Sequence, residues 1–376
     1  MRFTSTLLGF AAFQWSALGA SFTTTNTSPK REVTKRVAIV GLVHGHVAGL
    51  LPGLLKRTDV QLVAIAEPDK ALSQQYASSY NLSSDLFHTD LDQMLQDQHP
   101  DAVLVYTTIL DHRRVIEAAA KYGISSMVEK PLSTTLEDAL AIRETVRKRK
   151  NVRVLTNYET TWYASNAAAI EAARNGSLGT IRKVVVHDGH QGPAEIGVGP
   201  EWLPWLTDPV QNGAGALFDF GCYGADLVTV LHGGMAPESV MAVAQTDKPE
   251  EYPKVDDDAT VVLRYNGSQA VLMPSWNWPY ARKDMEVYGT NASLTTVGSN
   301  SVVMRKDASL GATESVPALP RERGDSLTYL IGVLDGKIKD EGDLTALDTN
   351  MVAMQILDAA RQSAMTGKSV QIKPLL

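Results

Sequence analysis

The sequence predicts an α/β chain with two domains: a doubly wound parallel sheet, then an α/β domain with an open, mostly antiparallel sheet. Up to residue 155, short apolar β-rich runs alternate with helical segments, as in a parallel sheet buried on both faces. Beyond residue 180, β-rich runs follow one another with short turns between them. A length of 376 residues, with 44% apolar and 20% charged residues, suits two globular domains.

The first domain is expected over residues 35–155. Each expected strand is preceded or followed by a segment in which apolar residues recur at helical spacing. These strands cover residues 36–41, 60–67, 101–107 and 125–129. Right-handed crossovers between parallel strands would place the helices on both faces of the sheet.

The second domain is expected over residues 156–376. Its strands are expected at 181–187, 240–245, 259–265, 269–276 and 285–288. One helix, from about 216 to 231, is expected to interrupt them, and a long helical pattern runs over 346–365. We expect this last helix to pack back on the first domain.

The N-terminus has the features of a targeting segment. An apolar stretch over residues 7–18 follows Arg2, and Ala17-Leu18-Gly19 offers the small residues that a signal peptidase prefers. Residues 1–19 are predicted to be a signal peptide, and residues 20–34 a flexible Ser/Thr-rich leader. A mitochondrial presequence is the alternative, because Arg2 is the only charged residue before residue 30.

Glycosylation acceptor triplets favour secretion. Chance would supply about two Asn-x-Ser/Thr triplets in this composition. The chain has five, which begin at Asn26, Asn81, Asn175, Asn266 and Asn291. A secreted glycoprotein is therefore expected, with random triplets in loops as the alternative.

Composition excludes several classes of protein. A net charge of −7 lacks the positive field that a phosphate backbone requires, so no nucleic-acid partner is expected. The single cysteine, Cys222, cannot form an intramolecular disulfide. No apolar run approaches the roughly 18 residues of a membrane span, so no membrane partner is expected. The spacing of His187, Asp188 and His190 matches no recognised metal site, and no metal is predicted.

The turn after the first strand, Gly41-Leu42-Val43-His44-Gly45-His46, has features of a dinucleotide-binding loop. Glycines let backbone amides approach a pyrophosphate at the start of the next helix. Val43 and His46 occupy positions where the usual G-x-G-x-x-G has glycines, so a plain strand-to-helix turn remains an alternative.

An acidic residue at the end of the second strand strengthens the nucleotide interpretation. Glu67 is placed to accept the ribose hydroxyls of an adenosine, and its charge would repel a 2′-phosphate, so NAD is favoured over NADP. Alternatively, Glu67 caps the helix that begins at Pro68.

Two further motifs identify a family. Glu129-Lys130-Pro131 ends a strand about 90 residues after the loop, and residues 213–223 read GAGALFDFGCY, a glycine-rich stretch followed by D-x-G-x-Y. Together with the loop, they resemble the glucose-fructose oxidoreductase, inositol dehydrogenase and MocA family. The resemblance implies an N-terminal Rossmann domain, bound NAD or NADP, and oxidation or reduction of carbohydrates and cyclitols. It also implies homo-oligomers that pair through the C-terminal sheet.

Within this resemblance, catalytic roles fall to Lys130, Asp219 and Tyr223. Asp219 and Tyr223 are four residues apart and would share one face of a helix. A tyrosine whose pKa is lowered by the Lys130 ammonium could take the proton of a substrate hydroxyl. Most family members carry histidine at the Tyr223 position. Alternatively, Tyr223 packs in the core, Asp219 only caps a helix or pairs with a lysine, and Lys130 lies on the surface.

The other predicted site residues follow from strand ends and loops. The predicted cofactor contacts are Gly41, Val43, His44, Gly45, His46, Glu67, Thr107, Thr108, His112, Glu129 and Lys130. The predicted substrate contacts are Tyr158, Trp162, His190, Trp205 and Trp276. A helix cap is an equal alternative for Thr108.

The function predicted from these residues is hydride transfer between NAD and a carbohydrate or cyclitol. One alternative is a redox-neutral NAD-dependent glycoside hydrolase, which oxidises, eliminates and re-reduces its substrate. Another is a protein that binds a dinucleotide or sugar without turnover. Because free NAD is scarce outside cells, a secreted enzyme of this kind is expected to hold its cofactor tightly.

Overall fold

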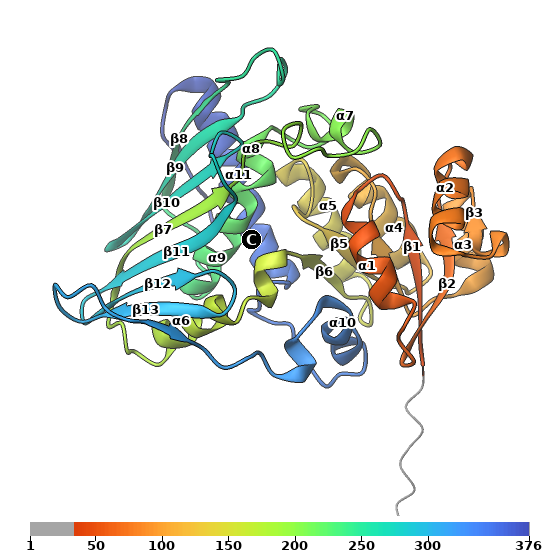
Figure 1. The fold of residues 1–376 in the computed structure, drawn as a ribbon, viewed down its shortest axis with the longest axis horizontal. Coiled ribbons are helices and arrows are strands. Elements are labelled where there is room, and N and C mark those ends of the chain that lie inside the picture. Colours follow the sequence, from red (N-terminus) through yellow and green to blue (C-terminus); the bar gives the residue numbers. More distant parts are fainter. Residues whose placement is uncertain (1–33, 376) are drawn as a thin grey trace, which may run out of the picture. The chain divides into compact units, whose positions relative to one another are not determined.

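The computed structural model describes residues 34–375 and contains two sheets (Figure 1). The predicted signal peptide, and the predicted leader up to residue 33, lie outside the described residues. The first sheet has six parallel strands in the order β3-β2-β1-β4-β5-β6. They are β1 (Lys35–Val40), β2 (Val60–Ala66), β3 (Phe87–His88), β4 (Ala102–Val105), β5 (Ser125–Glu129) and β6 (Val154–Asn157).

Helices cover both faces of this sheet because successive side chains of its buried strands point to opposite sides. In β1, Val37 and Ile39 belong to the apolar cluster that includes side chains of α1 (His46–Leu54), α2 (Lys70–Tyr80) and α10 (Ser326–Leu334). Ala38 and Val40 belong to the second cluster, with side chains of α3 (Leu91–Gln98), α4 (His112–Lys121) and α5 (Leu136–Arg147). The predicted doubly wound architecture is confirmed.

The second sheet has nine strands in the order β14-β13-β12-β11-β7-β10-β9-β8-β15. All pairs are antiparallel except β7 with β10. The strands are β7 (Ile181–Gly189), β8 (Ser239–Gln245), β9 (Asp258–Tyr265), β10 (Ser268–Ser275), β11 (Arg282–Gly289), β12 (Ser293–Val297), β13 (Ser301–Arg305), β14 (Thr313–Ser315) and β15 (Val370–Gln371). The mostly antiparallel sheet is as predicted, although β12, β13, β14 and β15 were not among the expected strands.

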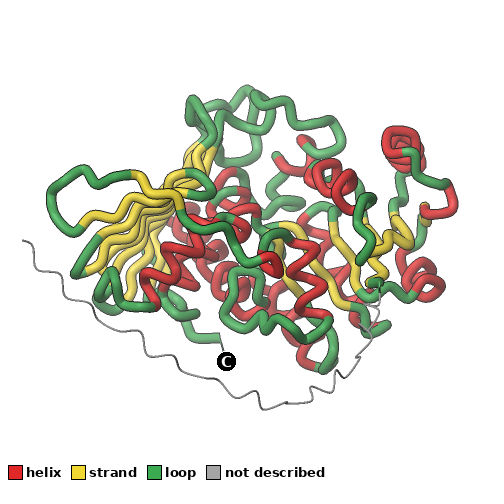
Figure 2. Tube along the Cα trace, turned by 60° about the horizontal axis from the view of Figure 1, so that its bottom comes forward, coloured by secondary structure: helices red, strands yellow, loops and turns green. Residues whose placement is uncertain are grey.

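Helices pack on one face of the nine-stranded sheet, as Figure 2 shows. They are α6 (Ala164–Arg174), α8 (Ala216–Asp219), α9 (Gly221–Leu231) and α11 (Leu347–Thr366). The opposite face carries exposed apolar side chains such as Met241, Val243 and Val262. Along β8 and β9 these exposed residues alternate with buried residues, whose side chains point to the other face. Pairing of two copies through this face stays a prediction.

Two helices bear directly on the site. The helix expected over 216–231 is interrupted at Phe220, so that α8 and α9 are separate. α11 packs on α9 and β8 and also on α5, as expected for a helix that packs back on the first domain. Residues from Thr34 onward consequently form one compact unit. No helix within residues 34–375 is long and apolar enough to cross a membrane.

Candidate active site

A cavity of about 400 Å³ opens at the carboxyl ends of β1, β2 and β4. Gly41, Val43, Glu67, Thr107 and Thr108 are among its lining residues. Gly41 has φ of +82°, and a Cβ atom there would lie only 2.6 Å from the Thr107 methyl group. Because only glycine fits this close approach, the turn can pass over β4 and leave room for a ligand.

Glu67 stands at this cavity with its carboxylate held by two backbone amides. Its oxygens accept hydrogen bonds from Leu42 N at 2.8 Å and Asp69 N at 2.9 Å. Burial raises the pKa of Glu67, and the two amide hydrogen bonds oppose that shift. Asp69 itself caps α2 by accepting from Ala71 N and Leu72 N, so Glu67 is not the cap of that helix.

The second half of the loop is covered by aromatic side chains from the other domain. The His44 ring is buried, with ring centroids 4.6 Å from Trp202 and 5.5 Å from Trp205. A Cβ atom on Gly45 would lie 2.3 Å from the Trp202 ring. The Trp205 indole N–H donates to Val43 O at 3.3 Å. Trp202 directly precedes α7 (Leu203–Leu206) and Trp205 lies within it, so the second domain lies against the turn.

The residues present fit the adenosine part of a dinucleotide better than its pyrophosphate part. At the adenosine end, a glycine held against β4, a carboxylate at the end of β2 and an open cavity match what adenosine and its ribose require. At the pyrophosphate turn, Trp202 leaves no room for even a methyl group on one side of Gly45. A pyrophosphate reaches that side only if the Trp202 segment moves.

A buried ion pair joins the two domains. The Lys130 ammonium, at the end of β5, donates to the Asp219 carboxylate and, at 2.9 Å, to Asp219 O. The Trp276 indole donates to the other carboxylate oxygen at 3.0 Å. Burial disfavours both charges, but the attraction between the two groups outweighs the effect of burial. The pKa of Lys130 is therefore raised and that of Asp219 is lowered. Lys130 is thus neither exposed nor free, and one of the alternatives considered for Asp219, a pair with a lysine, is what the structure contains.

Tyr223 lies beside this pair, but its pKa differs from the expectation. Its ring centroid is 5.1 Å from the Lys130 ammonium and 4.9 Å from that of Lys283. Burial raises the pKa of Tyr223 well above its ordinary value, whereas the sequence had suggested a lowered pKa. The reason is that the phenol is fully desolvated and the Lys130 charge is already compensated by Asp219.

A second group of charges near Tyr223 was not predicted. Lys283 on β11 forms an ion pair with Glu159, and its register partner on β7 is Asp188. Asp188 is 3% exposed, and its Oδ1 has no hydrogen-bond partner among the described residues. Burial raises the pKa of Asp188 well above its ordinary value. The neighbouring His190 packs its ring edge-on against Phe220, at 4.8 Å. The pairing of β7 with β11 creates this group, and no local motif indicates that pairing.

Glu129 is positioned by polar side chains from both sides. Its carboxylate lies 3.0 Å from His46 Nδ1 and accepts from Asn157 Nδ2 at 2.8 Å. Asn157 in turn accepts from the Trp162 indole at 3.1 Å. Trp162 also lines a separate pocket of about 460 Å³ and packs against the Tyr329 ring.

Several predicted contacts have structural partners instead of open surroundings. His112 is fully buried, with Nδ1 3.2 Å from Leu132 O. The Tyr158 hydroxyl donates to Asn350 at 2.8 Å, and its ring packs on Tyr223. Thr108, in contrast, lines the 400 Å³ cavity, and it precedes a 3₁₀ turn without a capping side-chain hydrogen bond to a backbone amide. The ligand contacts proposed for these residues stay predictions.

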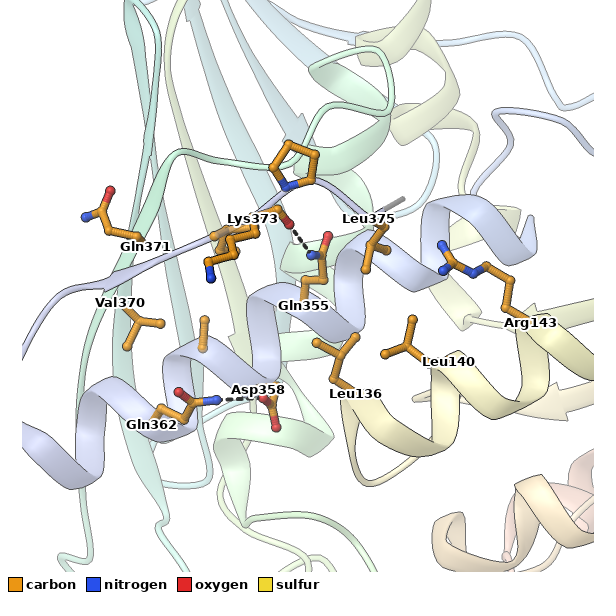
Figure 3. A pocket seen from close by; sticks show the side chains of 13 residues that line it. Leu136, Leu140, Arg143, Gln355, Asp358, Gln362, Val370, Gln371, Lys373 and Leu375 are labelled. Atoms are coloured by element: carbon orange, nitrogen blue, oxygen red, sulfur yellow. Dashed lines mark hydrogen bonds between the residues drawn. The ribbon is translucent and has the colours of Figure 1, made fainter.

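Another pocket lies away from all predicted site residues (Figure 3). It has a volume of about 450 Å³ between α5, α11 and the C-terminal segment from Val370. The Gln355 amide donates to Lys373 O at 2.8 Å across it. None of the catalytic candidates lines this pocket, so it has no part in the site.

Comparison with known proteins places both domains in one family. Residues 35–158 match the oxidoreductase family with an NAD-binding Rossmann fold (GFO/IDH/MocA), and residues 166–295 match the GFO/IDH/MocA C-terminal domain. Trans-1,2-dihydrobenzene-1,2-diol dehydrogenase from Homo sapiens is 25% identical over 234 residues, which are 61% of this chain and 64% of the relative. The match thus spans less than two thirds of that relative. 1,5-Anhydro-D-fructose reductase from Ensifer adhaerens is 24% identical over 85% of this chain and 94% of its own.

Solved structures share the fold. An inositol dehydrogenase homologue from Azotobacter vinelandii, in complex with NAD+, has a TM-score of 0.78 with 20% identity, covering 90% of this chain and 98% of its own. Aldose-aldose oxidoreductase from Caulobacter crescentus, in complex with glycerol, has a TM-score of 0.73 with 22% identity over 90% and 100% of the two chains. The fold, the motifs and the profile matches agree: the chain belongs to the GFO/IDH/MocA family of NAD-binding oxidoreductases.

Proposed function

We propose that this protein is an NAD-dependent oxidoreductase acting at a CH–OH carbon of a small polyhydroxylated molecule, such as a sugar, cyclitol or diol. Lys130 carries the proposal. Its charged group lies against Asp219 at the carboxyl edge of the parallel sheet, where ligands of open α/β sheets bind. The curated relatives with similar sequences are named as a diol dehydrogenase and a sugar-derived ketone reductase, which supports the same class of substrate.

The chain's own part in the reaction is to hold the substrate oxygen and to move its proton. A bound nicotinamide would supply the hydride chemistry. Lys130, kept charged by Asp219, would donate a hydrogen bond to the substrate oxygen and stabilise the negative charge that develops on it. Burial raises the pKa of Tyr223, so its phenol is neutral and can donate a proton to a ketone oxygen during reduction. The same proton returns to the tyrosine side of the site when the alcohol is oxidised.

The surroundings of Tyr223 support a polyol substrate. Lys283, Glu159 and Asp188 bring hydrogen-bond donors and acceptors to the aromatic faces of Phe220 and Tyr223. Sugars and cyclitols bind through such a mixture of polar groups and an apolar surface.

We further propose that the cofactor is NAD, not NADP, and that it exchanges slowly. Glu67 would accept the ribose hydroxyls and repel a 2′-phosphate. Trp202 and Trp205 cover the pyrophosphate turn, which would hinder both entry and release.

One assay distinguishes this function from its alternatives. The purified protein is unfolded and any released nucleotide is identified by mass spectrometry. The folded protein is then assayed with cyclitols, sugars, diols and aryl glycosides, with and without added NAD. A net change in reduced nicotinamide with a polyol or its ketone is expected. Aglycone release without such a change would indicate the redox-neutral glycoside hydrolase. Ligand binding without turnover would indicate a binding protein.

We also propose secretion with glycosylation. The four acceptor asparagines within the described residues, Asn81, Asn175, Asn266 and Asn291, are all exposed. Oligosaccharyl transfer requires such access. Expression of the full chain in a eukaryotic secretory host should give medium-borne protein whose mass falls on treatment with an N-glycanase. Retention in mitochondria without glycans would instead support the presequence interpretation.

A further inference from the structure

One buried carboxyl near Tyr223 has no partner. Asp188, close to the end of β7, is 3% exposed, and its Oδ1 accepts no hydrogen bond within residues 34–375. It forms no ion pair with any of these residues either. Buried carboxylates are ordinarily paired or hydrogen-bonded, because an isolated charge is costly to desolvate. An open carboxyl of this kind is available to a group on a ligand.

The register of the second sheet directs Asp188 towards the start of α9, which carries Tyr223. Asp188 is paired with Lys283 on β11 and with Pro274 on β10, so the three side chains share one face of the sheet. The Lys283 ammonium lies 4.9 Å from the centroid of the Tyr223 ring. Pro274 lies 3.6 Å from where a Cβ atom on Gly221, the first residue of α9, would be. Asp188 therefore faces the candidate active site and not the opposite side of the sheet.

The other charged side chains that act on Asp188 are already paired. They belong to three ion pairs, Lys130 with Asp219, Lys283 with Glu159, and Asp284 with Arg282. Because each pair is neutral, an ionised Asp188 would be a single negative charge in excess. Burial accordingly raises the pKa of Asp188 well above its ordinary value.

The kind of group that Asp188 can bind follows from this charge balance. A carboxylate on the ligand would add a second uncompensated negative charge. A hydroxyl could form a hydrogen bond but would leave the charge unbalanced. An ammonium would donate hydrogen bonds to the carboxylate and neutralise it at the same time. The group is open to solvent beside Glu159, whose side chain is 50% exposed.

We propose that Asp188 binds an ammonium group of the substrate, so that the preferred substrates are amino sugars or aminocyclitols. This inference rests on the proposed function, in which the substrate lies beside Lys130 and Tyr223, and it narrows the class of substrate. Asp188 determines specificity and takes no part in moving the proton of the reacting hydroxyl. Sugar acids, which carry a carboxylate, should be poor ligands.

The test compares ligands that differ in charge. The full chain, loaded with NAD, is titrated by calorimetry with D-glucose and scyllo-inositol, with amino-deoxy derivatives of both, and with the N-acetyl form of each derivative. At least one free amine should bind about ten- to a hundredfold more tightly than its N-acetyl form and than its neutral parent. D-Glucuronate should bind more weakly than D-glucose.

A matched pair of variants assigns this preference to one side chain. Asp188→Asn keeps the size of the side chain and removes its charge, so the preference for the amine over its N-acetyl form should fall about tenfold or more. Asp307→Asn, the same change at an exposed aspartate, should keep the preference. Thermal melts establish that both variants are folded.

Two outcomes would overturn the proposal. The wild type might bind no amine more tightly than the neutral parent, or folded Asp188→Asn could retain the preference of the wild type. Turnover is measured separately, as the change in reduced nicotinamide. Turnover of neutral polyols without a preference for amines would contradict this inference and leave the proposed function intact. Binding of amines that depends on Asp188, without turnover of any compound, would contradict the proposed function and support Asp188 as the ammonium site.

Discussion

The adenosine end and the reaction end of the candidate active site are built in different ways. The adenosine end belongs to one domain and depends on backbone geometry, with Gly41 against Thr107 and Glu67 held by two amides. The reaction end draws on both domains and depends on buried charges, with Lys130, directly after β5, meeting Asp219 at the end of α8. Local geometry makes a site robust, whereas charges buried between domains make it sensitive to the loss of any one partner.

The largest effect is expected from Lys130→Met at the reaction end. It removes the group proposed to hold the substrate oxygen, so turnover should fall by about a hundred- to ten-thousand-fold. It also leaves the Asp219 carboxylate buried without its partner, which should cost about 3–5 kcal/mol of unfolding free energy. Urea denaturation and steady-state kinetics measure the two effects.

The double variant Lys130→Met, Asp219→Asn provides the control for stability. It removes both charges and keeps an acceptor for the Trp276 indole, so most of the lost stability should return while activity stays low. If the double variant is no more stable than the single one, the ion pair does not account for the loss.

Tyr223→Phe should have the next largest effect, on turnover alone. The phenol is buried and makes its aromatic contacts through the ring, which the variant keeps. We expect kcat to fall about a hundredfold, with little change in NAD affinity or in Tm. Equal losses in kcat and in cofactor affinity would assign Tyr223 a structural role.

The difference between local geometry at the adenosine end and contacts between domains at the reaction end also decides what the sequence could predict. Four of the six Rossmann strands, Gly41 and Glu67 follow from local patterns, because each depends on residues close in the chain. The short strands β3 and β6 were not among the expected strands. Lys130, Asp219 and Tyr223 were identified by motifs, but their pairing, and hence the raised pKa of Tyr223, depends on contacts between domains. Lys283 and Asp188 meet only because β11 pairs with β7, and the Trp202 cover arises from a loop with no recognisable motif.

Trp202→Ala would remove the indole that covers the pyrophosphate turn, between the adenosine end and the reaction end. Trp202 lies directly on Gly45, so its removal should let a pyrophosphate reach the turn. We expect NAD to associate and dissociate several-fold faster, up to about tenfold, in stopped-flow fluorescence. Trp278→Ala, which truncates another partly buried tryptophan of the second domain, is the matched control and should leave both rates unaltered. Unchanged rates for both variants would mean that Trp202 does not gate the site.

The smallest effect is expected in the pH dependence of stability, for which we compare one buried carboxyl from each end of the site. Burial raises the pKa of both Asp188 and Glu67, but Glu67 accepts two amide hydrogen bonds and Asp188 Oδ1 accepts none. A carboxyl with a raised native pKa is most favourable to stability below its unfolded-state pKa, near 4, and this contribution is lost as the pH rises through the native pKa.

The Asp188→Asn variant has no carboxyl to ionise at this position, so its unfolding free energy should not fall for this reason as the pH rises. It should match the wild type near pH 4 and exceed the unfolding free energy of the wild type by on the order of 1 kcal/mol at pH 8. Glu67→Gln should instead be destabilised across the whole range, because its amide places a donor against one of the two backbone N–H groups that Glu67 now accepts. Urea denaturation at several pH values measures both. Parallel wild-type and Asp188→Asn curves would mean that the Asp188 carboxyl is as well solvated or paired as the carboxyl at the adenosine end, and the contrast between the two ends would then reduce to the Lys130 and Asp219 pair alone.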